Sequence, residues 1–146
     1  MNELVNQMKV VLASAFTFSL KAQNFHWNVE GPHFSEYHAL FGSIYEDVSD
    51  SVDEVAERIR TLDQYAPGSM SRFAQLSVVD DQINIPVARA MVQELQSDNV
   101  KVIAELTKAF DLAEKANKQG LADYFAGRID VHEKHGWMLR ATAKTQ

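Results

Sequence analysis

The chain of 146 residues contains no cysteine, so a disulfide framework and a thiolate zinc site are excluded. Basic residues are outnumbered, with 14 lysines and arginines against 20 aspartates and glutamates and a net charge of −6. This balance argues against a general affinity for DNA or anionic membranes. No run is long and apolar enough to cross a bilayer. A glycine-rich phosphate loop and a Ser-His-Asp arrangement are also missing, which removes two common enzyme classes.

The length and a composition of 46% hydrophobic and 23% charged residues predict one globular domain, residues 1–146, with a substantial core. The apolar run from Val10 to Phe18 contains Ala13-Ser14-Ala15, which loosely resembles a signal-peptide cleavage site. However, Glu3 and a single cation, Lys9, precede it, and the helical period continues through the supposed site. We therefore expect a cytoplasmic protein rather than an exported one.

Apolar residues recur at spacings of three and four along four stretches, which is typical of amphipathic helices. Their apolar stripes span residues 4–25, 37–62, 91–113 and 125–143. Gly31-Pro32 should end the first helix, and Ser35 is a good N-cap for the second. We expect the third helix to begin at Pro86 or Val87, with Asn84 available to cap it.

Between the second and third helices the pattern weakens, and residues 70–76 could form a short helix in this connection. A long crossover is what a bundle needs if its second and third helices are to run parallel. The sequence therefore predicts an all-α four-helix bundle with a long crossover that carries a short extra helix.

Two histidines and two carboxylates suggest a metal site. His26 and His38 lie on either side of the Gly-Pro break, and Asp53 and Glu57 are four residues apart. Residues at that spacing are neighbours on one face of a helix. Imidazole and carboxylate ligands together suit a first-row transition metal such as iron.

Helix geometry limits how these residues could meet. The fifteen residue steps from His38 to Asp53 correspond to roughly 22 Å along a straight helix, too far for one ion to bridge. If all four residues share a site, the histidines and carboxylates must come from different helices. The simplest arrangement pairs two copies of this helix antiparallel about a two-fold axis near Glu46 and Asp47. The spacing thus predicts a metal site shared between subunits.

Several motifs resemble those of one known family. They are Asn24-Phe25-His26-Trp27-Asn28-Val29, Gly31-Pro32-His33-Phe34, Asp53-x-x-x-Glu57-Arg58, the region of Phe73, and His132-Glu133-Lys134 with Trp137-Met138-Leu139. Together they resemble the Dps family, the DNA-binding proteins from starved cells or miniferritins. The resemblance covers nearly the whole chain.

This resemblance implies a ferritin-like bundle assembled into a hollow shell of twelve subunits. Such shells oxidise Fe(II), usually with hydrogen peroxide, store ferric mineral and thereby protect against oxidative damage. The family's ferroxidase ligands, at two-fold interfaces, match His26, His38, Asp53 and Glu57, and Trp27 matches a tryptophan beside that centre. Zinc or manganese could substitute for iron at these residues.

The chain departs from the family pattern in three places. Gly42 replaces the usual aspartate four residues after the second histidine, which should weaken the second iron position. Residues 1–7 contain no lysine or arginine and the C-terminal end offers only Arg140 and Lys144, which argues against DNA binding. At the family's pore Asp123 fits, but Lys118 stands where an acid is common, and Asp130 could supply another.

Several alternatives remain at this point. The assembly could be structural or DNA-associating, with Gly42 marking a weakened ferroxidase centre. Asp53 and Glu57 could form an ordinary solvated face, paired with Arg58 or Arg60. His33 is expected to be a turn residue. His132 and His135 are three apart and could bind a metal, but the apolar seam favours a hydrogen-bonded core role for His132.

Overall fold

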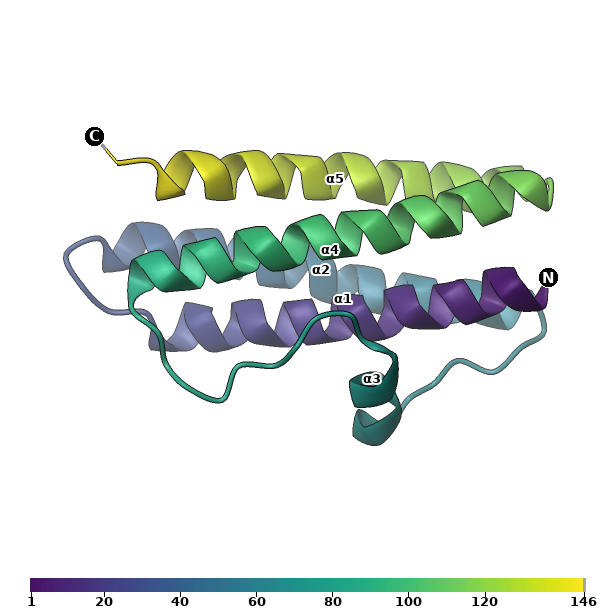
Figure 1. The fold of residues 1–146 in the computed structure, drawn as a ribbon, viewed down its shortest axis with the longest axis horizontal. Helices are drawn as coiled ribbons and strands as arrows, with labels where there is room; N and C mark the ends of the chain where they lie inside the picture. Colours follow the sequence, from purple (N-terminus) through teal and green to yellow (C-terminus); the bar gives the residue numbers. More distant parts are fainter. Residues whose placement is uncertain (146) are drawn as a thin grey trace.

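The structure, a computed structural model, describes residues 1–145, which form five α-helices and no strand. The helices are α1 (Asn2–Asn28), α2 (Phe34–Thr61), α3 (Met70–Leu76), α4 (Ala88–Lys115) and α5 (Gln119–Ala143). Four long helices lie side by side, and α3 sits outside them in the long connection from α2 to α4 (Figure 1). This connection carries the chain back to the end of the bundle where α2 begins, and α4 starts there, so α2 and α4 run parallel (Figure 1). The predicted bundle, its crossover and the short helix are confirmed.

The apolar stripes of the four long helices meet in a single core. α1 packs against α2, α3 and α4, and α4 packs against α5. Four phenylalanines from three of the helices are completely buried: Phe18, Phe25, Phe41 and Phe125. Burying a side chain of this size contributes about 1.5–3 kcal/mol relative to leaving it exposed. The core thus follows directly from the helical period of the sequence.

The helix starts differ from two of the expectations. Ser35 lies inside α2, whose N-cap is His33, because the turn closes early with a hydrogen bond from Phe34 N to Gly31 O (3.1 Å). Gly31 has a φ of 122°, a conformation that suits glycine and permits this turn. Asn84 does not cap α4, because the helix begins at Ala88 and its N-cap is Val87, whose backbone is extended.

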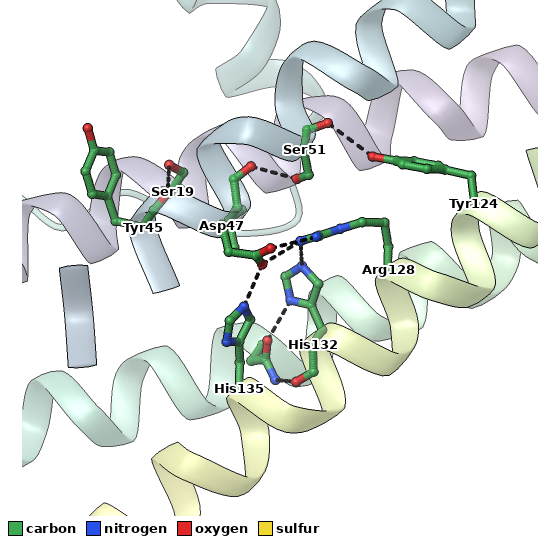
Figure 2. A network of polar contacts seen from close by, with 10 residues as sticks. Ser19, Tyr45, Asp47, Ser51, Tyr124, Arg128, His132 and His135 are labelled. Atoms are coloured by element: carbon green, nitrogen blue, oxygen red, sulfur yellow. Dashed lines mark hydrogen bonds and ion pairs between the residues drawn. The ribbon is translucent and has the colours of Figure 1, made fainter. Parts of the chain in front are cut away.

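Long polar side chains join α2 to α5 (Figure 2). Arg128 donates two hydrogen bonds to the Asp47 carboxylate, both of 2.9 Å, and His135 Nε2 donates a third of 2.7 Å. Further along the same helices, the Tyr124 hydroxyl donates to the carbonyl of Ser51 (3.4 Å). Burial alone would raise the pKa of Asp47, but the hydrogen bond from His135 and the Arg128 guanidinium outweigh it and hold that pKa well below its usual range.

His132 lies beneath this network and is 1% exposed. Its Nδ1 donates to Asn99 Oδ1 (2.8 Å), while Asn99 Nδ2 donates to the carbonyl of His132 (2.8 Å). Its Nε2 accepts from Arg128 at 3.2 Å, so both ring nitrogens have partners. Burial and the neighbouring Arg128 lower the pKa of His132 to about 3. The prediction of a hydrogen-bonded core histidine is confirmed.

A buried ion pair joins α1 to α4. Lys21 Nζ lies 2.8 Å from Asp98 Oδ2 and 3.5 Å from Glu94 Oε1. Lys21 is 3% and Asp98 5% exposed. Burial raises the pKa of Asp98 even though Lys21 opposes the shift. Removing one partner of such a pair leaves the other without compensation inside the protein.

None of the helices within residues 1–145 combines the length and the apolar character needed to cross a membrane.

The buried pair predicts a large loss of stability for Lys21→Met. Because Asp98 would lose its cationic partner, we expect the free energy of unfolding to fall by about 3–5 kcal/mol. Lys108→Met is the matched control, since Lys108 pairs with Glu105 at 3.0 Å but its side chain is 61% exposed. That variant should lose less than about 1 kcal/mol. Urea denaturation at one protein concentration compares the two, and equal losses would contradict the prediction.

The environment of His132 predicts a pH-dependent stability. Below pH 6.5 the unfolded chain protonates this histidine, whereas the folded protein does not until about pH 3. Unfolding therefore takes up a proton in this window, and its free energy should fall by about 1.4 kcal/mol for each pH unit of acidification.

The His132→Gln variant should lose this contribution to the pH dependence of the free energy of unfolding. The His33→Gln variant, which alters an exposed histidine, should keep it. Urea unfolding between pH 7 and pH 4.5 measures the slopes. If His132→Gln kept the wild-type slope, His132 would not be the group responsible.

Candidate metal centre

His26 and His38 lie on either side of the turn that joins α1 to α2. His26 is in the last turn of α1, and His38 is near the start of α2. Because the two helices pack against each other around a short turn, these positions face one another. Their rings are stacked, with centroids 3.8 Å apart and planes inclined by 14°. The fold therefore brings together the two histidines that the sequence suggested as ligands.

Each of these histidines is bonded to the backbone of the other. His26 Nδ1 lies 2.7 Å from the carbonyl oxygen of His38, and His38 Nδ1 lies 2.6 Å from the carbonyl oxygen of His26. A carbonyl oxygen only accepts, so each Nδ1 must carry the proton and donate. In the neutral rings both Nε2 atoms then keep a lone pair. Histidines that bind metals are commonly oriented by such a bond from the other ring nitrogen.

The two carbonyls of this pair differ in their helical setting. The carbonyl of His26 belongs to the last turn of α1, where the helix supplies no further amide and an acceptor is left free. The carbonyl of His38 lies within α2, where the helical pattern assigns it the amide of Gly42. An ideal Cβ at Gly42 would lie 2.8 Å from both Nδ1 and Cε1 of His26. Glycine therefore leaves the space in which the ring sits.

Aromatic and acidic side chains surround the histidine pair. Phe34 stacks on His38 with centroids 5.0 Å apart. Trp27, which follows His26 in the chain, is 62% exposed. His26 and Gly42 also line an open hollow together with the acidic residues Glu46, Asp47 and Asp50. Because carboxylates outnumber cations along this wall, the hollow favours a cation over an anion.

Asp53 and Glu57 lie further along α2, and both are exposed. Among residues 1–145 neither takes part in a hydrogen bond or an ion pair of its side chain. The neighbouring arginine, Arg58, instead bonds to Glu54 at 2.9 Å and lies over the ring of Tyr124. Arg60 lies over the ring of Tyr65. Arg58 and Arg60 therefore do not form ion pairs with Asp53 or Glu57, and the alternative of an ordinary paired surface is not what the subunit shows.

A single subunit does not bring the four candidate ligands together. In the described part of the chain no group of three or more His, Cys, Asp or Glu side chains could hold a metal ion. The structure joins His26 to His38 but leaves Asp53 and Glu57 apart from them on the same continuous helix. Within one subunit, the histidine pair and the two carboxylates therefore remain separate groups.

Sequence reasoning missed two features of this region. It did not predict the reciprocal bonds of the histidine pair, although Gly42 stands four residues after His38, where a helix brings the amide back to that carbonyl. It also missed the bonds from Arg128 and His135 to Asp47, because these residues lie 81 and 88 positions from Asp47 in the chain and the sequence gave no signal that they are close in space.

Comparisons with known proteins agree with this architecture. A ferritin-like domain family matches residues 5–145. An uncharacterized low temperature-induced protein of Nostoc is 34% identical over 98% of this chain and 81% of its own length. DNA protection during starvation protein 2 of Bacillus anthracis is 30% identical over 95% of this chain and 93% of its own.

Solved structures show the same fold. Dps from Staphylococcus aureus has a TM-score of 0.95 at 29% identity, covering 100% of this chain and 98% of that one. The Dps protein of Vibrio cholerae O1 has a TM-score of 0.93 at 29% identity, covering 98% and 90%, and is described as a ferritin-like diiron-carboxylate protein. The family model, the curated relatives and the solved structures all match this chain along nearly its whole length. The chain therefore belongs to the Dps family of ferritin-like proteins.

Proposed function

We propose that this protein is a miniferritin that oxidises Fe(II) at centres between subunits and stores the ferric product in a hollow shell. The observation that carries the proposal is the His26–His38 pair, whose Nδ1 atoms are both committed to backbone carbonyls. This arrangement leaves two Nε2 atoms free to bind a metal. The diiron-carboxylate description of the Vibrio cholerae relative supports the choice of iron.

In this proposal each centre takes His26 and His38 from one subunit and Asp53 and Glu57 from the other. Because α2 continues without a break from Phe34 to Thr61, His38 and Asp53 of one subunit remain roughly 22 Å apart. An antiparallel pairing of two α2 helices about a two-fold axis would place each histidine pair opposite a carboxylate pair. Trp27, exposed in the single subunit, would then be covered beside the centre.

The ligand set suits oxidation of its substrate, Fe(II). Imidazoles hold Fe(II), and carboxylates favour the more highly charged Fe(III) product. Two Fe(II) ions together give two electrons to one hydrogen peroxide. Its O–O bond breaks, and with two protons it yields two waters and two Fe(III). Since both electrons pass in one event, no hydroxyl radical is released. The reaction would in this way protect the cell against oxidative damage.

The wider assignment follows the family. We propose a cytoplasmic shell of twelve subunits, in which zinc or manganese can compete with iron for the same ligands. DNA is not expected to be a partner, because the net charge of −6 opposes binding to phosphates. The alternative is a structural or DNA-associating assembly with a weakened centre, for which Gly42 was the main indication.

The proposal predicts that Asp53→Ala and Glu57→Ala lose iron oxidation but keep the assembly. Each removes one carboxylate that makes no bond within its own subunit, so folding should be little affected. The purified protein is loaded anaerobically with Fe(II), treated with stoichiometric peroxide and separated by gel filtration, with protein and iron read in the same fractions. Wild type should carry soluble ferric iron in a large oligomer, and the initial rate should fall at least about tenfold in either variant.

Asp111→Ala is the matched control, because it removes an exposed carboxylate from α4 and should oxidise iron as wild type does. Unchanged oxidation in Asp53→Ala and Glu57→Ala would remove the proposed site. Iron that precipitates away from an intact wild-type oligomer would favour the structural alternative.

A further inference from the structure

We propose that Phe34 is a positioning residue for His38, and that its ring makes His38 the fixed member of the histidine pair while His26 stays adjustable. The role of the two histidines as metal ligands rests on the proposed function. The contact between Phe34 and His38 does not, because it is present within the subunit itself.

The start of α2 brings Phe34 and His38 together. Phe34 is the first residue of the helix, and its amide donates to the carbonyl of Gly31 (3.1 Å) in the turn before it. His38 follows four residues later, so the two side chains are neighbours on one face. Side chains on a helix lean toward its N-terminus, which brings the His38 ring back over the first turn. The two ring centroids are 5.0 Å apart, with planes inclined by 24°.

The His38 ring is covered on both of its faces. His26 stacks on it with centroids 3.8 Å apart and planes inclined by 14°, and Phe34 stacks on it at 5.0 Å. Two rings this close to one imidazole cannot share a face, because side by side their atoms would approach closer than the roughly 3.5 Å of van der Waals contact. His38 therefore lies between Phe34 on one side and His26 on the other.

The covered faces fix what the hydrogen bond of His38 leaves free. Its Nδ1 donates to the carbonyl of His26 at 2.6 Å, which holds one ring atom in place. The plane of the ring could still turn about this atom, because the outer torsion of a histidine side chain is broadly distributed. A ring packed between two others cannot turn without moving one of them. Phe34 thus helps to keep Nε2 of His38 in a single direction.

His26 is held less tightly than His38. It stacks on His38 by one face, and the next aromatic ring, that of Tyr45, has its centroid 6.3 Å away. His26 also borders the open hollow lined by Gly42 and Asp50. Its ring therefore has space to adjust to a metal, whereas the ring of His38 has not. The difference between the two histidines comes from Phe34.

A simpler role for Phe34 would be to cover apolar surface. Its side chain is 42% exposed, so another subunit could pack on it. Two substitutions separate these roles. Phe34→Leu keeps an apolar side chain but removes the flat ring, and Phe34→Tyr keeps the ring. If Phe34 positions His38, the leucine variant is impaired and the tyrosine variant is not. If only apolar cover matters, leucine is tolerated.

The first test is solid-state NMR of the metal-free assembly labelled with ¹⁵N-histidine, at about pH 8.5, where free histidine is neutral. The ¹⁵N shifts show which ring nitrogen carries the proton, and His38→Gln assigns the signals. Wild type and Phe34→Tyr should show His38 in one form, with the proton on Nδ1. Phe34→Leu should add a form with the proton on Nε2, the one that a free side chain favours in water. A single wild-type form in Phe34→Leu would overturn the proposal.

The second test is anaerobic calorimetry with Co²⁺ as the probe. Phe34→Leu should bind Co²⁺ about two- to tenfold more weakly than wild type, the factor expected for the loss of one aromatic pair. Phe34→Tyr should stay within about twofold of wild type. Phe110→Leu is the matched control, because it makes the same change at a half-buried phenylalanine of α4 and should bind as wild type does.

Wild-type affinity in Phe34→Leu, or an equal loss in Phe34→Tyr, would overturn the proposal. A wild type that does not bind Co²⁺ would refute the proposed function instead. The NMR measurement would still decide the role of Phe34, because it requires no metal.

A double substitution shows whether Phe34 acts through His38. In a His38→Gln background the imidazole is absent, so Phe34→Leu should weaken Co²⁺ binding no further. A defect of assembly caused by Phe34→Leu would appear in both backgrounds, so a loss confined to the protein that retains His38 identifies the ring contact. A further loss in the His38→Gln background would mean that Phe34 serves another neighbour, and the proposal would be wrong.

Discussion

The mutual bonding of His26 and His38 is the interaction on which the functional interpretation depends. Each imidazole donates to the other residue's carbonyl, at 2.7 and 2.6 Å, and these two bonds determine which nitrogen of each ring remains free. A pair of histidines that merely packed together would carry no such information. Here the backbone of each helix orients the ring of the other, so the two Nε2 atoms that we propose as ligands are already oriented by the protein itself.

The rest of the fold holds α1 and α2 in the positions that this pair requires. Their apolar stripes interlock through Phe25 and Phe41, whose ring centroids lie 6.1 Å apart. Lys21 and Asp98 join α1 to α4, and Asp47 joins α2 to Arg128 of α5. Buried polar groups of this kind stabilise only when they are paired, and among the described residues no buried side-chain nitrogen or oxygen lacks a partner. The two helices that bear the histidine pair are therefore each held by a second helix, α1 by α4 and α2 by α5.

Much of the fold could be predicted from the sequence because helical periodicity is a local signal. The four stripes, the short helix at Met70–Leu76 and the buried position of His132 all followed from spacing alone. The N-cap residues of α2 and α4 were placed wrongly, since the turn at Gly31 and the extended backbone of Val87 decided them. At the candidate site the residues could be named, but the bonds between them could not. They arise where two helices meet, and the space at Gly42 becomes visible only once the His26 ring is placed.

The proposed centre takes half of its ligands from one subunit and half from its partner. The most direct measurement is a crystal structure of the assembled protein soaked anaerobically with Fe(II), with the metal located by anomalous scattering. We expect an anomalous peak at the two-fold interface, from a metal bound by Nε2 of His26 and His38 of one subunit and by Asp53 and Glu57 of the other. A metal held by residues of a single subunit, or an interface in which these two halves do not meet, would contradict this proposal.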